Sequence, residues 1–164
     1  MTLTVVIGGA RSGKSALAVR LAAETGRPVT FVATGEARDA EMAARVAAHR
    51  AERPAEWSTV EEPVDLRGAL ERAPANDTVV VDCLSLWVAN LLERGLEPGE
   101  AAAAAAARSA PTIAVTNEVG LGIVPMTELG RAYRDLLGRE NAAWVAASDR
   151  ALFVVAGRAL ELVG

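Results

Sequence analysis

One short motif near the amino terminus constrains the fold of this chain more than any other feature. Residues 8–15 read Gly-Gly-Ala-Arg-Ser-Gly-Lys-Ser, the pattern of glycine, four residues, glycine, lysine and serine. This pattern functions between a strand and a helix. Leu3–Ile7 is a β-branched apolar run typical of a buried parallel strand, and Ser15–Glu24 has good helix composition. The motif therefore predicts the start of a parallel α/β fold.

The same motif is suited to holding phosphate groups. Its glycines let successive backbone N–H groups turn inward into a concave anion site, and the following helix adds partial positive charge. Lys14 is the only lysine; its ammonium is expected to reach the β- and γ-phosphates of a nucleotide, with the Ser15 hydroxyl on a bridging Mg²⁺. The alternative is a glycine-rich turn without a ligand. The predicted nucleotide-binding residues are Gly8, Gly9, Ala10, Arg11, Ser12, Gly13, Lys14 and Ser15.

Length and composition favour one globular domain, residues 1–164, with 51% hydrophobic and 23% charged residues. No apolar run is long enough to span a bilayer, and the amino terminus runs directly into a strand, so we expect a cytoplasmic protein without a membrane partner. The net charge of −4 disfavours nonspecific binding to nucleic acid, which leaves a small molecule as the expected partner. The lone Cys83 excludes an internal disulfide, and its apolar surroundings favour packing.

Apolar runs alternate with helical segments along the chain. This order predicts a mostly parallel sheet with helices on both faces, which binds ligands beyond the carboxyl ends of its strands. The predicted strands are Leu3–Ile7, Val29–Ala33, Trp57–Val60, Thr78–Cys83, Thr112–Thr116 and Leu152–Ala156. Helices are predicted over Ser15–Glu24, Asp39–Glu52, Pro98–Ser109 and Arg131–Ala147, the last interrupted at Gly138.

Polar residues lie at or just after the carboxyl ends of two of these strands. Asp82 ends an apolar strand, where a phosphate-loop protein has the acid that holds Mg²⁺ directly or through water; the alternative is an ordinary helix cap. Asn117 and Glu118 begin a loop with two glycines and a proline, which we interpret as a substrate or metal loop without an assigned role. Ordinary loop packing is the alternative there.

His49 is the only histidine and lies near the end of the predicted helix Asp39–Glu52. Helical spacing places Glu41, Arg45 and His49 on one face. An arginine one turn away disfavours the protonated imidazole, leaving a neutral nitrogen as a nucleophile or base. A partly exposed histidine at a helix end is equally compatible with the residues.

Taken together, several blocks resemble one known family, the bifunctional adenosylcobinamide kinase and adenosylcobinamide-phosphate guanylyltransferase of cobalamin biosynthesis. The resemblance covers nearly the whole chain in order. The blocks are Gly8–Ser15; Ala33-Thr34 with Asp39, Glu41-Met42 and Arg45; His49 with Arg53-Pro54, Trp57 and Glu61; Val81–Leu84 with Leu86-Trp87 and Asn90–Leu92; Asn117–Pro125; and Arg134-Asp135, Gly138, Asn141, Asp149 and Val155–Gly157.

This resemblance implies a RecA-like P-loop NTPase fold and two reactions. The enzyme would phosphorylate adenosylcobinamide with ATP or GTP, then transfer GMP from GTP to the product through a GMP adduct on His49, releasing pyrophosphate. It also implies Mg²⁺, catalytic roles for His49 and Lys14, and a homotrimer. Beyond the glycine-rich motif, the residues that it assigns to the nucleotide are Ala33, Thr34, Gly35, Arg50, Ala51, Glu52, Arg53, Glu61 and Asp82.

Three departures from the family pattern stand out: Met126 where an acid is frequent, Ala142 where glutamine is common, and a short alanine-rich segment between Leu92 and Thr112. None removes the residues for guanylyl transfer. Two alternatives remain open: a P-loop small-molecule kinase without a covalent intermediate, and a nucleotide-dependent switch module. The general base of the kinase step has no candidate in the sequence.

Overall fold

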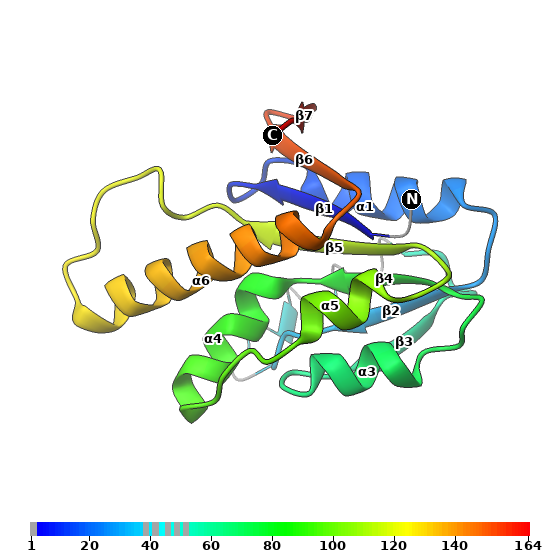
Figure 1. The fold of residues 1–164 in the computed structure, drawn as a ribbon, viewed down its shortest axis with the longest axis horizontal. Coiled ribbons are helices and arrows are strands. Elements are labelled where there is room, and N and C mark those ends of the chain that lie inside the picture. Colours follow the sequence, from blue (N-terminus) through cyan, green and yellow to red (C-terminus); the bar gives the residue numbers. More distant parts are fainter. Residues whose placement is uncertain (1–2, 38–39, 41–42, 45–46, 48–49, 51–52) are drawn as a thin grey trace.

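A computed structural model describes residues 3–37, 40, 43–44, 47, 50 and 53–164. Their strands form one seven-stranded sheet in the order β3-β2-β4-β5-β1-β6-β7 (Figure 1). The strands are β1 (Leu3–Gly8), β2 (Val29–Ala33), β3 (Ser58–Glu61), β4 (Thr78–Asp82), β5 (Thr112–Asn117), β6 (Arg150–Val155) and β7 (Arg158–Leu162).

Strands β1 to β6 pair in parallel, and β7 alone runs antiparallel, beside β6. The first six strands therefore end at one edge of the sheet. The central strands β4 and β5 are mostly apolar and are buried except at their last residues, as expected for parallel strands that helices cover on both faces. The predicted α/β fold with a mostly parallel sheet is confirmed.

Helices cover both faces of the sheet (Figure 1). On one face α1 (Lys14–Glu24) buries Leu17, Ala18 and Ala22 against β-strand residues such as Phe31 and Val80. The other face is covered by α3 (Leu66–Arg72), α4 (Leu84–Arg94), α5 (Ala101–Ala106) and α6 (Glu128–Ala147). Two tryptophans hold the centre of that second layer: Trp87 and Trp144 are almost fully buried, with ring centroids 6.5 Å apart in an edge-to-face arrangement.

The structure differs from the sequence-based expectations at several elements. The helices α3 and α4 were not among the predicted ones, and α6 begins three residues before Arg131. The alanine helix is shorter than predicted, because α5 begins only at Ala101. The predicted break at Gly138 is absent, since α6 is continuous from Glu128 to Ala147. β7 was not predicted; it forms because Ala156 and Gly157 both have positive φ and make a two-residue turn back along β6.

The segment between β5 and α6 stands away from the rest of the molecule (Figure 1). Within it Leu121 and Ile123 are 81% and 96% exposed, and Met126 is 97% exposed. Among the described residues, no helix is both long and apolar enough to cross a bilayer.

Candidate functional site

The glycine-rich loop joins β1 to α1, as predicted. A Cβ on Gly8 would lie 2.6 Å from both the Ser12 Oγ and the Val154 carbonyl oxygen, so only glycine fits where the loop leaves the strand. Gly13 caps α1 with φ of 98°, a left-handed conformation that glycine adopts without strain. The loop therefore presents its backbone at the amino end of a three-turn helix, which is the geometry of an anion site.

Hydrogen bonds within the loop and from the β6–β7 turn hold the loop in place. Lys14 Nζ donates to the Gly9 carbonyl oxygen at 3.1 Å, which connects the ammonium to the loop backbone. The Ser12 carbonyl oxygen accepts from Gly157 N–H at 2.9 Å, so the β6–β7 turn supports the loop from behind. The buried Ser12 Oγ has no hydrogen-bond partner within the described part of the chain.

Other predicted residues come to the same edge because the strands are parallel and in register. Ala33, the last residue of β2, is paired with Glu61 on one side and Asp82 on the other. Farther along the sheet, Gly8 is paired with Asn117. Backbone bonds continue past the strand ends, from Thr34 N–H to the Asp82 carbonyl oxygen (3.3 Å) and from Glu118 N–H to the Gly8 carbonyl oxygen (3.2 Å). The sheet thus gathers the predicted positions of five separate segments.

The junction between β2 and β4 is locked by one hydroxyl. Thr34 is fully buried; its Oγ1 donates to the Cys83 carbonyl oxygen (2.7 Å) and accepts from Cys83 N–H (2.9 Å). Burial, and then the charge of Asp82, raise the pKa of the Cys83 thiol, which lies 2.9 Å from Ser85 Oγ. The thiol therefore stays protonated near neutral pH, in agreement with the predicted packing role.

Two buried amides support this edge, and neither is in the predicted site. Asn90 Nδ2, from α4, donates to the carbonyl oxygens of Thr34 (2.8 Å) and Pro63 (3.1 Å). Asn141, from α6, accepts from Thr116 Oγ1 (2.7 Å) and donates to the Asn117 carbonyl oxygen (3.0 Å). For Asn90, an asparagine within an apolar helical stretch is the sequence signal that could have identified it, because a buried amide needs specific partners. Asn141 follows Arg139 and Glu140 and carries no such signal.

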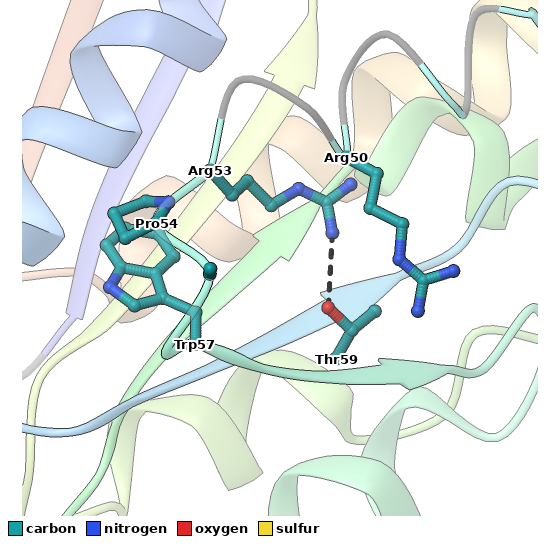
Figure 2. A pocket seen from close by; sticks show the side chains of 6 residues that line it. Arg50, Arg53, Pro54, Trp57 and Thr59 are labelled. Atoms are coloured by element: carbon teal, nitrogen blue, oxygen red, sulfur yellow. Dashed lines mark hydrogen bonds between the residues drawn. The ribbon is translucent and has the colours of Figure 1, made fainter.

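A shallow hollow of about 220 Å³ lies beside β3, lined by Arg50, Arg53, Pro54, Ala55, Trp57 and Thr59 (Figure 2). The Arg53 guanidinium carbon lies 3.4 Å from the centroid of the Phe31 ring, and its Nη1 donates to Thr59 Oγ1 at 3.5 Å. Stacking on the ring fixes the plane of the guanidinium. Two arginines at this hollow make it suited to anionic groups.

The oxygen groups at this edge suit a magnesium ion that is bound partly by substrate phosphates, and they do not form a complete metal site by themselves. Asp82 and Ser15 are both partly exposed, and the described residues contain no cluster of three or more histidine, cysteine or acidic side chains. Mg²⁺ is usually held by one or two protein oxygens together with substrate phosphates and water. The residues present suit a metal that arrives with a nucleotide.

Three predicted site residues, His49, Ala51 and Glu52, lie outside the described residues. Of the predicted helix Asp39–Glu52, the described positions 40, 43, 44, 47 and 50 have helical backbone.

A glycine-rich loop between the first strand and helix, with an acid at the end of β4, defines the chain as a P-loop NTPase with a RecA-like sheet. A solved structure of an ATPase domain has this fold: it aligns with a TM-score of 0.50 and 12% identity over 93% of this chain and 68% of that one.

Sequence comparison identifies the family. Residues 4–162 match the family model "Cobinamide kinase / cobinamide phosphate guanyltransferase". The bifunctional adenosylcobalamin biosynthesis protein CobP of Pseudomonas aeruginosa is 45% identical over 98% of this chain and 96% of its own length. The corresponding protein CobU of Salmonella typhimurium is 35% identical over 98% and 99%. The chain belongs to the cobinamide kinase and cobinamide phosphate guanyltransferase family.

Proposed function

We propose that this protein phosphorylates adenosylcobinamide with ATP or GTP and then transfers GMP from GTP to adenosylcobinamide phosphate, giving adenosylcobinamide-GDP and pyrophosphate. The observation that carries the proposal is the register of the sheet, which brings Gly8, Ala33, Glu61, Asp82 and Asn117 to one edge. The family match over residues 4–162 supports the same reading.

Each part of that edge has a role in the proposal. The loop N–H groups and Lys14 bind the triphosphate, and Ser15 and Asp82 would hold Mg²⁺, which neutralises charge on the phosphates. Arg50 and Arg53 are suited to the nucleotide because their guanidinium groups line one hollow next to β3. Positioning and electrostatic stabilisation account for most of the catalysis expected in phosphoryl and nucleotidyl transfer.

The guanylyl step is proposed to run through His49. A neutral imidazole nitrogen attacks the α-phosphorus of GTP, a nitrogen–phosphorus bond forms, and pyrophosphate leaves with the electrons of the broken bond. A phosphate oxygen of adenosylcobinamide phosphate then attacks the same phosphorus and releases the imidazole. Covalent catalysis divides one difficult displacement into two easier ones.

Labelling with α-³²P GTP and Mg²⁺ tests this step. We expect protein-bound label that acid releases and base does not, as for a phosphoramidate, and no label on a His49→Ala variant. Label that is absent from the wild-type protein, or equal in the variant, would refute the histidine intermediate. A protein that phosphorylates adenosylcobinamide but never becomes labelled would be a P-loop small-molecule kinase.

Dependence on the acceptor separates an enzyme from a switch. A biosynthetic enzyme should consume GTP or ATP rapidly only when a corrinoid is present, whereas a switch module hydrolyses nucleotide slowly without one. We therefore expect adenosylcobinamide to stimulate nucleotide consumption, and we expect Asn117 and Glu118, at the root of the projecting loop, to contact that substrate. An Asn117→Ala variant should then raise the KM for adenosylcobinamide more than the KM for GTP.

We further propose that the protein is a cytoplasmic homotrimer. Support comes from the resemblance to the family and from the projecting loop, where Leu121, Ile123, Val124 and Met126 are each more than half exposed. Exposed apolar side chains gathered in one loop are typical of an interface. Sedimentation equilibrium should give three times the chain mass, and replacing Ile123 and Met126 by serine should shift the mass towards that of one chain.

A further inference from the structure

Helix α4 directly follows β4, the strand that ends at Asp82, and it contacts the chain just after the ends of β2 and β3. Its residue Asn90 is 6% exposed and donates through one amide nitrogen to the Thr34 and Pro63 carbonyl oxygens. Both partners are carbonyl oxygens, so the group between them must be the donating NH₂. Thr34 follows β2 and Pro63 follows β3. A single side chain therefore fixes the exits of two strands relative to a third.

One helical turn farther along α4, Arg94 binds the same segment. Its Nη2 lies 2.8 Å and 3.0 Å from the two carboxylate oxygens of Glu36, and its Nη1 donates to the Asn90 carbonyl oxygen at 3.0 Å. Residues four apart share a face of a helix. Because Glu36 is two residues beyond Thr34, this face of α4 holds the chain at two successive points just after β2.

Neither contact is required for burying the helix. The apolar side of α4 packs through Leu84, Trp87, Val88 and Leu91, and a leucine would bury more apolar surface than Asn90 at that position. The carbonyl groups of Thr34 and Pro63 lie beyond the paired strand residues, so the sheet supplies them no donor. The amide and the guanidinium therefore set where the strand exits lie.

We infer that Asn90 and Arg94 are positioning residues of the nucleotide site, which act by holding the Thr34–Glu36 segment and the chain after Glu61 at fixed distances from Asp82. This inference rests on the proposed function only in taking that edge as the GTP site. Neither side chain needs to touch the nucleotide. Loss of either should weaken binding because the strand exits would no longer be held in one arrangement.

The Arg94–Glu36 pair gives the sharper test, because both side chains are partly exposed, at 36% and 28%, and the variants should fold. The dissociation constant of GTP with Mg²⁺ is measured by calorimetry for Arg94→Gln, Glu36→Gln and the double variant, each in a His49→Ala background that forms no adduct, with the His49→Ala protein as the reference. We expect each single change to weaken binding about tenfold and the double change to add less than about twofold, since the two groups act as one unit.

Arg150→Gln is the matched control. Arg150, which is 33% exposed and so resembles Arg94, makes an ion pair with the more exposed Glu161, 3.2 Å apart, at the start of β6 and away from the carboxyl ends of the strands. It should lower the melting temperature by about as much as Arg94→Gln does, yet leave the GTP dissociation constant within about twofold of wild type. Asn90→Asp should weaken binding more than Arg94→Gln, because a carboxylate would face two carbonyl oxygens without a donor between them.

Wild-type affinity in both single variants, effects that multiply in the double variant, or an equal loss in Arg150→Gln would each overturn the inference. Binding is measured without turnover, so the test does not depend on the histidine intermediate. If wild-type protein binds GTP but forms no labelled adduct, the proposed guanylyl transfer fails and the positioning test still stands. If the adduct forms and Arg94→Gln binds GTP normally, the positioning role alone fails.

Discussion

The buried hydroxyl of Thr34 should contribute more to stability than its size suggests. It is fully buried, and it exchanges two hydrogen bonds of 2.7 Å and 2.9 Å with the backbone of Cys83. A Thr34→Val variant keeps the shape but leaves the Cys83 N–H without its acceptor, whereas the Cys83 carbonyl oxygen still accepts from Trp87 N–H at 3.2 Å. The orphaned N–H costs about 1–3 kcal/mol and the second lost hydrogen bond about 1 kcal/mol, so we expect a decrease of about 2–4 kcal/mol in the free energy of unfolding.

Thr34→Ser is the control for this prediction. It retains the hydroxyl and removes one methyl group, which should cost only about 1 kcal/mol. Urea unfolding followed by fluorescence of the buried Trp87 and Trp144 gives both values by linear extrapolation. The reasoning is refuted if the valine variant is as stable as wild type, or if the serine variant is the less stable of the two.

Three further predictions follow from the glycines, a helix cap and the lysine. Gly13→Ala should lower the free energy of unfolding by about 1–2 kcal/mol, because Gly13 has a φ of 98°. Gly138→Ala should raise it by about 0.5–1 kcal/mol, because Gly138 lies within α6 and a Cβ there would meet open space. Urea titration measures both. Asp65 caps α3 by accepting from Gly68 N–H, and that bond, together with its partner Arg72, lowers the pKa of the carboxyl. Because the folded-state pKa is lowered, the stabilisation is present at neutral pH and lost as pH falls. Asp65→Ala should therefore lower the free energy of unfolding by about 1 kcal/mol at pH 7, and the difference in that free energy between variant and wild type should decrease below about pH 4. Lys14→Ala should weaken GTP binding about 100-fold, because it removes the ammonium proposed to bind the triphosphate; calorimetry in a His49→Ala background checks this.

The fold was predictable where apolar runs and glycines carry local information. The strand Thr78–Asp82 is apolar until its last residue, and the loop before Lys14 has a pattern that requires a strand and a helix around it. β7 escaped prediction because Arg158–Leu162 is made of good helix formers, such as arginine, alanine and leucine. The turn at Gly157 and pairing with β6 override that preference.

Part of the candidate site was also predictable from the sequence, and part of it was not. Residues at the carboxyl end of a strand, such as Asp82 and Asn117, could be assigned to one edge of the sheet, because parallel strands end together. Which strands are neighbours could not be read from the chain: β5 separates β4 from β1, although it follows both in sequence. Pairing is decided by contacts between distant segments, and periodicity says only which face of an element is buried.

The side chains that connect the strand ends were the least predictable, and the reason lies in their sequence separation. Asn90 meets Thr34 across 56 residues, and Arg94 meets Glu36 across 58. Helical periodicity places Asn90 and Arg94 on one face of α4 but cannot name a backbone carbonyl as the partner. A polar residue at a position where the helix should be apolar is nevertheless visible in the sequence. Such a residue is costly unless its hydrogen bonds are satisfied, so it indicates that the neighbouring chain segment must be held in a defined place.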